Sequence, residues 1–303
     1  MRRMPPGIDC VWPMGRPREG GAAMPEKVMN VDTVEKPFHR TLFRRKLGLW
    51  YYSMRRYALW MTMNRAFARE RRDVPLPYIT FEHKTPLMRK LKDVDMWMQK
   101  NKVKNLSIAV PKVNAIIIRP GQVFSYWKLI GRPSRRKGYV PGMILREGAV
   151  ISGTGGGLCQ LSNLIFWMAI HTPLTIVERH RHRYDVFPDS NRTQPFGSGA
   201  TCYYPHGDLM IRNDTPNTYQ LMVEVGEDDL IGSIRCDVPM NRRYEIVERE
   251  HQITNFWWGG FCRHNELWQQ AYTLEGQLLE EKRIVTNDAI MMYTPYLESS
   301  EKQ

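Results

Sequence analysis

One cysteine follows a run of glycines and opens a segment with the composition of a helix. The stretch GTGGGLCQLSN begins at Gly153 and carries the thiol at Cys159. The residues that follow contain neither Pro nor Gly until Pro173, which predicts a helix over 159–171. In the first turn of a helix, unpaired backbone N–H groups and the positive end of the helix dipole stabilise an anion. The position therefore favours a reactive thiolate.

The glycines before this thiol let the backbone turn sharply and approach a bound group closely. Their spacing matches no phosphate-binding loop, because GTGGG lacks the GxGxxG pattern and no Lys-Ser or Lys-Thr pair follows it. We expect this turn instead to receive the oxyanion of an acyl-transfer reaction. The residues concerned are Gly155, Gly156, Gly157 and Gln160.

The segment after the helix supplies candidate bases for a cysteine nucleophile. We expect one strand over 175–187, TIVERHRHRYDVF, whose alternation places His180 and His182 on the same face. One histidine would face the thiol, and the other would orient it or bind substrate. A polar group on a later strand would hold the imidazole in one tautomer. The candidates for that group are Asp208 and Asn213.

Two other interpretations of the thiol stay open at this point. A small cysteine also fits a crowded contact between helix and sheet, where the histidines would make structural hydrogen bonds. A zinc site would need Cys159, His180, His182 and Cys202, whose separations match none of the compact zinc spacings. The five cysteines of the chain lack a CxxC pair, which also argues against a disulfide framework. We expect no metal ion, no cofactor and a reducing compartment.

Positive charge is concentrated in the first third of the chain. The net charge is +13; residues 1–104 carry 23 Lys and Arg against 10 Asp and Glu, whereas residues 105–303 carry 21 of each. This asymmetry argues against a nucleic-acid groove spread over the whole protein, and we expect no nucleic-acid partner. It favours a basic N-terminal segment that faces an anionic partner. A solvated basic helix without a partner is the alternative.

From about Lys46 to Arg72, apolar residues recur at spacings of three and four, which predicts an amphipathic helix with arginines on its other faces. The stripe consists of Leu47, Trp50, Met54, Tyr57 and Met61. Such a stripe packs on the protein's own core or lies in the headgroup layer of an anionic membrane. Its uncharged runs fall short of the roughly 20 residues that span a bilayer, and residues 1–25 lack the apolar segment of a secretory signal. We expect a cytoplasmic protein with, at most, peripheral contact with the membrane.

The rest of the chain predicts an α+β fold. Short runs of β-branched and aromatic residues, separated by Gly and Pro, indicate strands. They cover residues 78–83, 123–127, 143–151, 175–187, 200–205, 208–213 and 219–225. We expect a further helix over 87–116 and a strand-and-helix extension over 241–303. The expected architecture is a central, mostly antiparallel sheet with a helix that carries the cysteine, preceded by the basic amphipathic helical region.

Three regions follow from this organisation. They are a flexible tail over 1–35, a basic helical region over 36–104 and an α+β domain over 105–303. The alternative is a single structural unit over 36–303.

Several motifs stand in a fixed order along the chain. They are PGQVFSYW (120–127), GGGLCQLSNL (155–164), ERHRH (178–182), FGSGAT (196–201) and DLMIRN (208–213). In this order they resemble the short, single-domain form of the VanW family, which is named for its association with vancomycin-resistance clusters. The likeness extends from about His39 to Tyr296. The chain departs from the family at Arg183, where Ser is usual, and at Cys202, where Val is common.

The resemblance implies a role in cell-wall metabolism. Some proteins with this domain are implicated in cell-wall cross-linking as cysteine-dependent L,D-transpeptidases, with the cysteine of the GGGxCQ motif as the nucleophile. That residue is Cys159 here, His180 and His182 stand in the ERHxH motif, and Arg179 would hold a substrate carboxylate. We therefore expect a cysteine-dependent acyl transferase or amidase that acts on a cell-wall peptide or precursor. The alternative is a non-catalytic module that binds an anionic or peptide ligand at the membrane surface.

Overall fold

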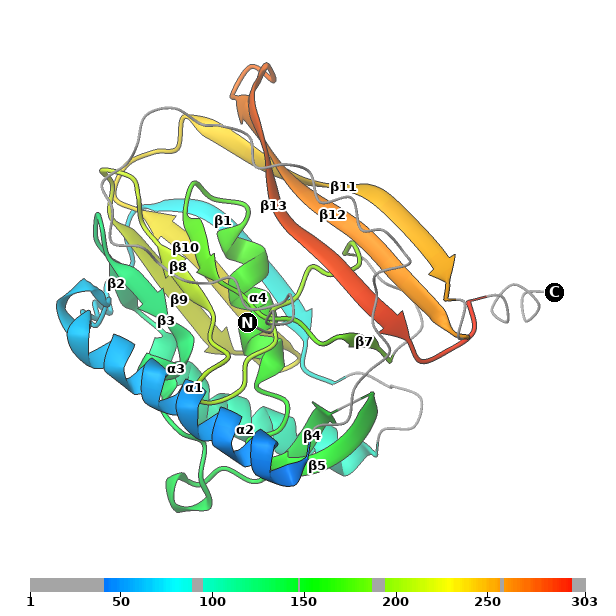
Figure 1. Cartoon of the computed structure of the whole chain (residues 1–303). Coiled ribbons are helices and arrows are strands. Elements are labelled where there is room, and N and C mark those ends of the chain that lie inside the picture. Colours follow the sequence, from blue (N-terminus) through cyan, green and yellow to red (C-terminus); the bar gives the residue numbers. More distant parts are fainter. Residues whose placement is uncertain (1–40, 89–94, 147, 187–193, 257–258, 296–303) are drawn as a thin grey trace. The chain divides into compact units, whose positions relative to one another are not determined.

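A computed structural model describes residues 41–88, 95–146, 148–186, 194–256 and 259–295 (Figure 1). The chain divides into two units, residues 1–40 and 41–303, and every described residue belongs to the second. The expected tail over 1–35, with Cys10, therefore lies outside the described residues.

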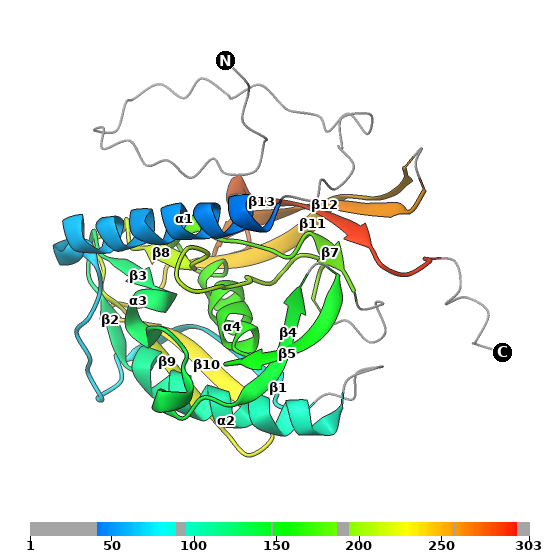
Figure 2. The same ribbon diagram turned by 60° about the horizontal axis from the view of Figure 1, so that its bottom comes forward.

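Helices begin where side chains satisfy the first free N–H groups. The Thr41 hydroxyl accepts a hydrogen bond from the Arg44 N–H at the start of α1, and Ser125 accepts one from Lys128 at the start of α3. In the view of Figure 2, α4 lies between α1 and α2. The helical segments are α1 (Leu42–Thr62), η2 (Asn64–Ala66), α2 (Met96–Val113), α3 (Tyr126–Ile130), η3 (Arg135–Lys137) and α4 (Cys159–Ala169).

The described strands form four sheets with the orders β1-β10-β9-β2, β11-β12-β13-β7, β3-β8-β6 and β4-β5. Within the described residues every pair is antiparallel except β7 with β13. The prediction of a mixed α+β fold with mostly antiparallel strands is confirmed, although the strands are shared among four sheets. The strands are β1 (Tyr78–Pro86), β2 (Ile116–Ile118), β3 (Val123–Ser125), β4 (Pro141–Arg146), β5 (Ala149–Thr154), β6 (Thr175–Glu178), β7 (Tyr184–Asp185), β8 (Met210–Arg212), β9 (Tyr219–Val225), β10 (Asp229–Cys236), β11 (Arg242–Asn255), β12 (Phe261–Thr273) and β13 (Leu278–Met291).

The main core lies where α4 packs on one face of the sheet that contains β10. Alternate residues of β10 are buried, as expected for a strand with one covered face. Gly232 belongs to the covered face, where a side chain would collide with Met168 and Leu164 of α4. α4 is buried almost all round, including Phe166. The sheet and its surroundings therefore hold the helix that begins at Cys159 in one position.

The three long strands β11, β12 and β13 attach to this core through apolar side chains, among them Ile246 and Val285, and through polar contacts. Gln269 of β12 donates to the carbonyl oxygens of Ile170 and Thr172, just after α4, at 2.6 and 2.9 Å. Asn265 of β12 donates to the Phe196 carbonyl at 2.6 Å. These amides replace water on backbone groups that would otherwise be buried without partners.

The structure corrects several predicted elements. The expected strand over 175–187 is interrupted, because β6 ends at Glu178 and β7 contains only Tyr184 and Asp185. Between them the His180 carbonyl accepts from Thr201 in a loop, and the Arg183 carbonyl accepts from Ile290 of β13, where the parallel pairing of β7 with β13 begins. The alternation that was expected to place both histidines on one strand face therefore does not apply.

Other predicted segments change type or split. Residues 123–127 divide into β3 and the start of α3, and residues 143–151 form parts of the two strands of a hairpin, β4 and β5. Residues 200–205 form no strand. The charged stretch EGQLLEEKR, assigned to a strand-and-helix extension, lies in a turn and in β13, because pairing with β12 outweighs its helix propensity. Within the described residues, no helix is both long and apolar enough to cross a membrane.

The close approach of two backbones at Gly142 and Gly156 generates a stability prediction. A Cβ on Gly156 would lie 2.1 Å from the Gly142 carbonyl carbon, whereas a Cβ on Gly48 of α1 would meet no atom within 4 Å. We expect Gly156→Ala to lower the free energy of unfolding by roughly 1–3 kcal/mol through overpacking. The control Gly48→Ala should raise it by roughly 0.5–1 kcal/mol. Urea unfolding followed by circular dichroism measures both, and a Gly156→Ala variant as stable as the wild type would contradict the prediction.

Candidate functional site

The Cys159 thiol lies at the start of α4, against the loop that leads to Cys202. The thiol hydrogen-bonds the backbone of Cys202. One turn further along α4, Ser162 donates to the Ala200 carbonyl at 2.6 Å, and Asn163 accepts from the Ala200 N–H at 2.8 Å. The first turn of α4 is thus held against residues 200–202 by side chains on a single helix face.

Burial governs the protonation of this thiol. Desolvation raises the pKa of Cys159, and the hydrogen bond with the backbone of Cys202 opposes that rise without cancelling it. The lowering expected from the helix N-terminus is therefore outweighed. Burial also raises the pKa of Cys202 well above its ordinary value, with a further contribution from the charge of Asp208. Both thiols are protonated at neutral pH in this structure.

The N–H groups of the glycine turn donate hydrogen bonds to backbone carbonyls of the protein. Gly155 donates to Val140 at 3.0 Å and Gly157 donates to Met143 at 2.9 Å, which ties the turn to the residues around the start of β4. The N–H of Gly156 bonds Gly153 and that of Gln160 bonds Gly157. The four residues expected to form an oxyanion site thus donate their N–H groups to backbone carbonyls of the turn and of the residues around the start of β4, which braces the beginning of α4.

The side chain of Gln160 reaches back to β1. Its amide nitrogen donates to the Thr85 hydroxyl and to the Pro86 carbonyl, both at 2.9 Å. Its amide oxygen is buried and has no hydrogen-bond partner among the described residues. A buried amide oxygen of this kind is a ready acceptor for a donor group on a ligand.

His180 belongs to a polar cluster centred on Glu178. Its Nε2 lies 2.8 Å from a Glu178 carboxylate oxygen, and its Nδ1 lies 3.2 Å from the Tyr203 hydroxyl. The same Glu178 oxygen accepts hydrogen bonds from Arg56 of α1 at 2.5 Å and from the Asp208 N–H at 3.0 Å. Burial alone would raise the pKa of Glu178, but the hydrogen bond from His180 and the charge of Arg56 lower it below its ordinary value. Glu178 is therefore a buried, paired carboxylate.

His182 stands in different surroundings. Burial, with a smaller contribution from the charge of Arg181, lowers the pKa of His182 to about 4. The described contacts include no hydrogen bond to either of its ring nitrogens, and none joins Cys159 to either histidine. The imidazole of His182 is neutral at pH 7 and retains a basic lone pair.

The remaining predicted residues are engaged by the protein itself. Asp208 is fully buried and accepts hydrogen bonds from the Ser125 hydroxyl at 2.5 Å and the Trp127 N–H at 2.8 Å. Burial, together with the charge of Glu178, raises its pKa to about 7. Asn213 donates to the Ile118 and Asn217 carbonyls and organises a turn. Within the described residues, neither side chain touches a histidine ring.

Arg179 braces the loop over residues 197–199. Its guanidinium donates to the Gly197 and Gly199 carbonyls and to Asn287 of β13 at 2.5–2.9 Å, and it lies over the Phe166 ring. Burial, with the charge of Arg181, lowers its pKa to about 9. Each terminal nitrogen of Arg179 therefore already serves a protein acceptor.

Sequence reasoning missed four members of the cluster. Arg56 lies on a distant helix, Tyr203 stands in the predicted strand over 200–205, and His206 falls between two predicted strands. The His206 carbonyl accepts from Arg56, and the His206 ring lies 4.9 Å from that of Tyr203. Glu178 could have been found, since it stands in the quoted ERHRH motif. No three His, Cys, Asp or Glu side chains form a metal-binding group in the described part of the chain.

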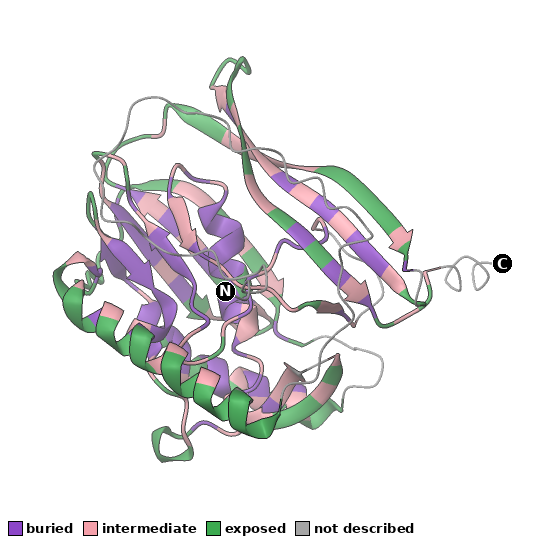
Figure 3. Ribbon diagram, in the orientation of Figure 1, coloured by how far each residue is buried: buried purple, intermediate pink, exposed green. Residues whose placement is uncertain are grey.

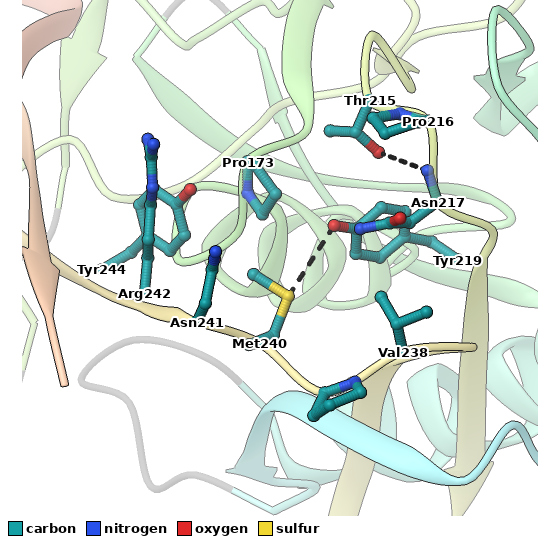
Figure 4. Close-up of a pocket in the computed structure, with 11 residues that line it drawn as sticks. Pro173, Thr215, Pro216, Asn217, Tyr219, Val238, Met240, Asn241, Arg242 and Tyr244 are labelled. Atoms are coloured by element: carbon teal, nitrogen blue, oxygen red, sulfur yellow. Dashed lines mark hydrogen bonds between the residues drawn. The ribbon is translucent and has the colours of Figure 1, made fainter.

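A separate cavity of about 340 Å³ lies at one end of β9 (Figure 4). Tyr219 and Met240 face each other in it, and the Tyr219 hydroxyl lies 3.8 Å from the Met240 sulfur. None of the predicted site residues lines this cavity. Its walls are Pro173, Thr215, Pro216, Asn217, Tyr219, Val238, Pro239, Met240, Asn241, Arg242 and Tyr244.

Comparisons with known proteins agree on one family. The family of VanW-like proteins matches residues 101–235. The vancomycin B-type resistance protein VanW of Enterococcus faecalis is 34% identical over 219 residues, which cover 72% of this chain and 79% of that protein. The uncharacterized protein YoaR of Bacillus subtilis is 31% identical over 114 residues, 38% of this chain and 36% of that protein. No solved structure matches the chain.

The raised pKa of Asp208 predicts a pH dependence of stability. Its carboxyl titrates at about 7 in the folded chain against an ordinary 3.8, so the folded state binds this proton more tightly than the unfolded state. The contribution of Asp208 to stability is therefore greatest below pH 3.8 and is lost as pH rises to about 7. Relative to the isosteric Asp208→Asn variant, the wild type should lose up to about 4 kcal/mol between pH 4 and pH 7.

Urea unfolding at pH 4.5, 5.5, 6.5 and 7.5 measures this difference. Asp214 is the matched control: burial acts to raise the pKa of its carboxyl, but hydrogen bonds from Arg212 and Thr175 and the nearby positive charges together lower it. Asp214→Asn should therefore give a difference that changes in the opposite direction. A constant difference between wild type and Asp208→Asn would refute the assignment.

Proposed function

This chain belongs to the VanW-like family, and we propose that it is a cysteine-dependent acyl-transfer enzyme with Cys159 as its nucleophile. The observation that carries the proposal is the place of the thiol, at the first residue of α4 and in hydrogen-bond contact with the backbone of Cys202. The position of Cys159 in the GGGLCQ motif supports the same assignment. The vancomycin-resistance name of the Enterococcus relative supports a cell-wall peptide or precursor as the substrate class.

Because the Cys159 thiol is protonated, the reaction needs a general base. Because burial raises the pKa of Cys159, attack requires a base that removes the thiol proton as the bond to carbon forms. His182 has a neutral ring at pH 7, since burial lowers its pKa to about 4. The ring nitrogens of His180 already face Glu178 and Tyr203. We therefore assign the base to His182, which reaches the thiol through a water or by a side-chain rotation when substrate binds.

The reaction then proceeds in two steps. The Cys159 sulfur attacks the carbonyl carbon of a peptide bond, its proton passes to His182, and His182 gives that proton to the leaving amine. The thioester is next attacked by a second amine, which makes the chain a transferase, or by water, which makes it an amidase. The attacking group loses a proton to His182, and the thiol of Cys159 is regenerated.

Two observations favour a second candidate, a binding module without turnover. The glycine turn spends its N–H groups on the backbone, and the Gln160 amide oxygen is buried with no hydrogen-bond partner among the described residues. Both features suit a rigid pocket wall that recognises a peptide donor. This candidate predicts ligand binding that does not depend on the thiol, so the two functions separate on one variant.

Formation of an acyl adduct on the thiol is the first test. Wild-type protein incubated with synthetic peptidoglycan stem peptides and quenched in acid should gain the mass of the acyl group on Cys159. Cys159→Ala should gain none, with an unchanged melting temperature, because the reacting atom is gone. Intact and peptide mass spectrometry measure both.

Cys202→Val is the matched control for this test. It removes the neighbouring thiol and restores the residue that is common in the family, so the adduct should still form on Cys159. An absent adduct in the wild type, together with equal peptide affinity of wild type and Cys159→Ala in calorimetry, would reject the enzyme and support the binding module.

The pH dependence of adduct formation tests the base. A neutral imidazole with a pKa of about 4 predicts a rate that is nearly flat between pH 5.5 and pH 8, because His182 stays unprotonated over that range. A preformed thiolate would instead give a rate that rises about tenfold per pH unit below the thiol pKa. His182→Gln should lower the rate by about 10²–10⁴-fold. A steep rise with pH, or an unaffected His182→Gln variant, would contradict this assignment.

A further inference from the structure

The outward face of α1 carries an apolar stripe that is largely exposed and that the described residues leave uncovered. Figure 3 shows α1 exposed along its length on this side. The side chains of Phe43, Trp50 and Met61 are 75%, 62% and 77% exposed. Their neighbours Leu47, Met54 and Tyr57 are exposed as well. We infer that this stripe is a docking surface for the interfacial region of an anionic membrane.

The stripe lies on the side of α1 that does not hold the helix in place. Positions 43, 47, 50, 54, 57 and 61 differ by three or four residues, so they share one face of the helix. The opposite face docks through Arg56 and Trp60, which are 7% and 8% exposed. Arg56 bonds Glu178, and the Trp60 carbonyl accepts from Lys128 at 2.8 Å. Of the stripe, Tyr57 at its edge also contacts the fold, through a hydrogen bond of its hydroxyl to that of Tyr204 at 3.3 Å, whereas Phe43, Trp50 and Met61 stay more than half exposed.

Charge identifies the occupant of this face. Residues 36–69 contain nine Lys and Arg and no Asp or Glu. Within α1, Arg44, Lys46 and Arg55 are exposed and flank the stripe. An apolar stripe with aromatic side chains and flanking cations is the pattern that binds the headgroup layer of an anionic bilayer.

Two protein occupants fit this charge poorly. A second copy would bring the same cations to the same face, and like charges across an interface repel. Residues 1–40 carry seven Lys and Arg against five Asp and Glu, so they also bring net positive charge. An anionic lipid surface is the partner that complements both the stripe and its cations.

Docking by this face would bring the polar cluster close to the membrane. Arg56 lies on the inward side of the same helix and bonds Glu178, which in turn holds His180. The diameter of a helix with its side chains is about 10–12 Å. A membrane bound to the stripe would therefore lie about one helix diameter from Arg56.

Co-sedimentation of the full chain with vesicles tests the inference. We expect binding to vesicles of phosphatidylglycerol and phosphatidylcholine, weak binding to phosphatidylcholine alone, and loss of binding as salt rises. The triple variant Arg44→Glu, Lys46→Glu, Arg55→Glu should partition at least about tenfold more weakly, since each cation near an anionic surface contributes about fivefold. Trp50→Glu should also weaken binding, because it places a charge in the apolar stripe.

Control variants outside α1 test whether vesicle binding depends on this helix. Arg135→Glu, Arg136→Glu, Lys137→Glu changes the net charge by the same amount at the exposed segment η3 and should leave binding unchanged. Leu274→Glu alters an apolar side chain that is 70% exposed outside α1 and should also have no effect. Equal loss in these controls would overturn the assignment to α1.

Three other outcomes of these experiments would contradict the membrane proposal. Equal partitioning to anionic and neutral vesicles, or none to either, would overturn the inference. A wild-type dimer in sedimentation equilibrium that Trp50→Glu converts to a monomer would identify a second copy as the occupant. A chain that binds no vesicles and remains a monomer would leave residues 1–40 as the cover of the stripe, which also contradicts the membrane proposal.

Discussion

A buried carboxylate, Glu178, holds together parts of the chain that are far apart in sequence. One of its oxygens accepts from Arg56 on α1, from the ring of His180 and from the Asp208 N–H. A charge taken out of water is tolerated only when its partners are complete, and removing one partner from a buried pair costs roughly 3–5 kcal/mol. The placement of α1, the path of the chain after β6 and the orientation of His180 thus depend on the same carboxylate.

This carboxylate also sets the protonation of its neighbours. Arg56 and His180 keep the pKa of Glu178 low, so the cluster accommodates one negative charge. A second charge nearby is unfavourable, since the pKa of Asp208 is raised to about 7 by burial and by Glu178. The thiols of Cys159 and Cys202 likewise stay protonated, chiefly because of burial. A cysteine reaction here would therefore begin from a neutral thiol and need a neutral base.

The sequence predicts local features of this fold better than their surroundings. β9 follows from the run YQLMVEV, which is rich in apolar residues, and the helix predicted over 159–171 overlaps α4 because no Pro or Gly interrupts it. The strand expected over 175–187 is interrupted after β6 for a reason that no pattern reveals: the His180 carbonyl finds its partner in the Thr201 N–H of a loop. Alternation cannot distinguish a strand from a loop whose backbone is paired elsewhere.

The candidate site shows the same limit. The motifs pointed to Cys159 and His180. They could not point to Arg56, which lies 122 positions before its partner Glu178 in the sequence. The expected acidity of Cys159 rested on its place in the helix, which follows from sequence. Its actual pKa depends chiefly on burial, which only the folded chain defines.

The spacing of apolar residues in α1 is compatible with two opposite orientations of the helix. A stripe at spacings of three and four predicts a buried face as well as a membrane-facing one. The fold decides between them by burying Arg56, because its guanidinium pairs with Glu178 and the side of the helix that carries Arg56 therefore faces inward. Trp50 and its apolar neighbours are then turned outward. The exposed stripe is in this sense a consequence of the buried ion pair.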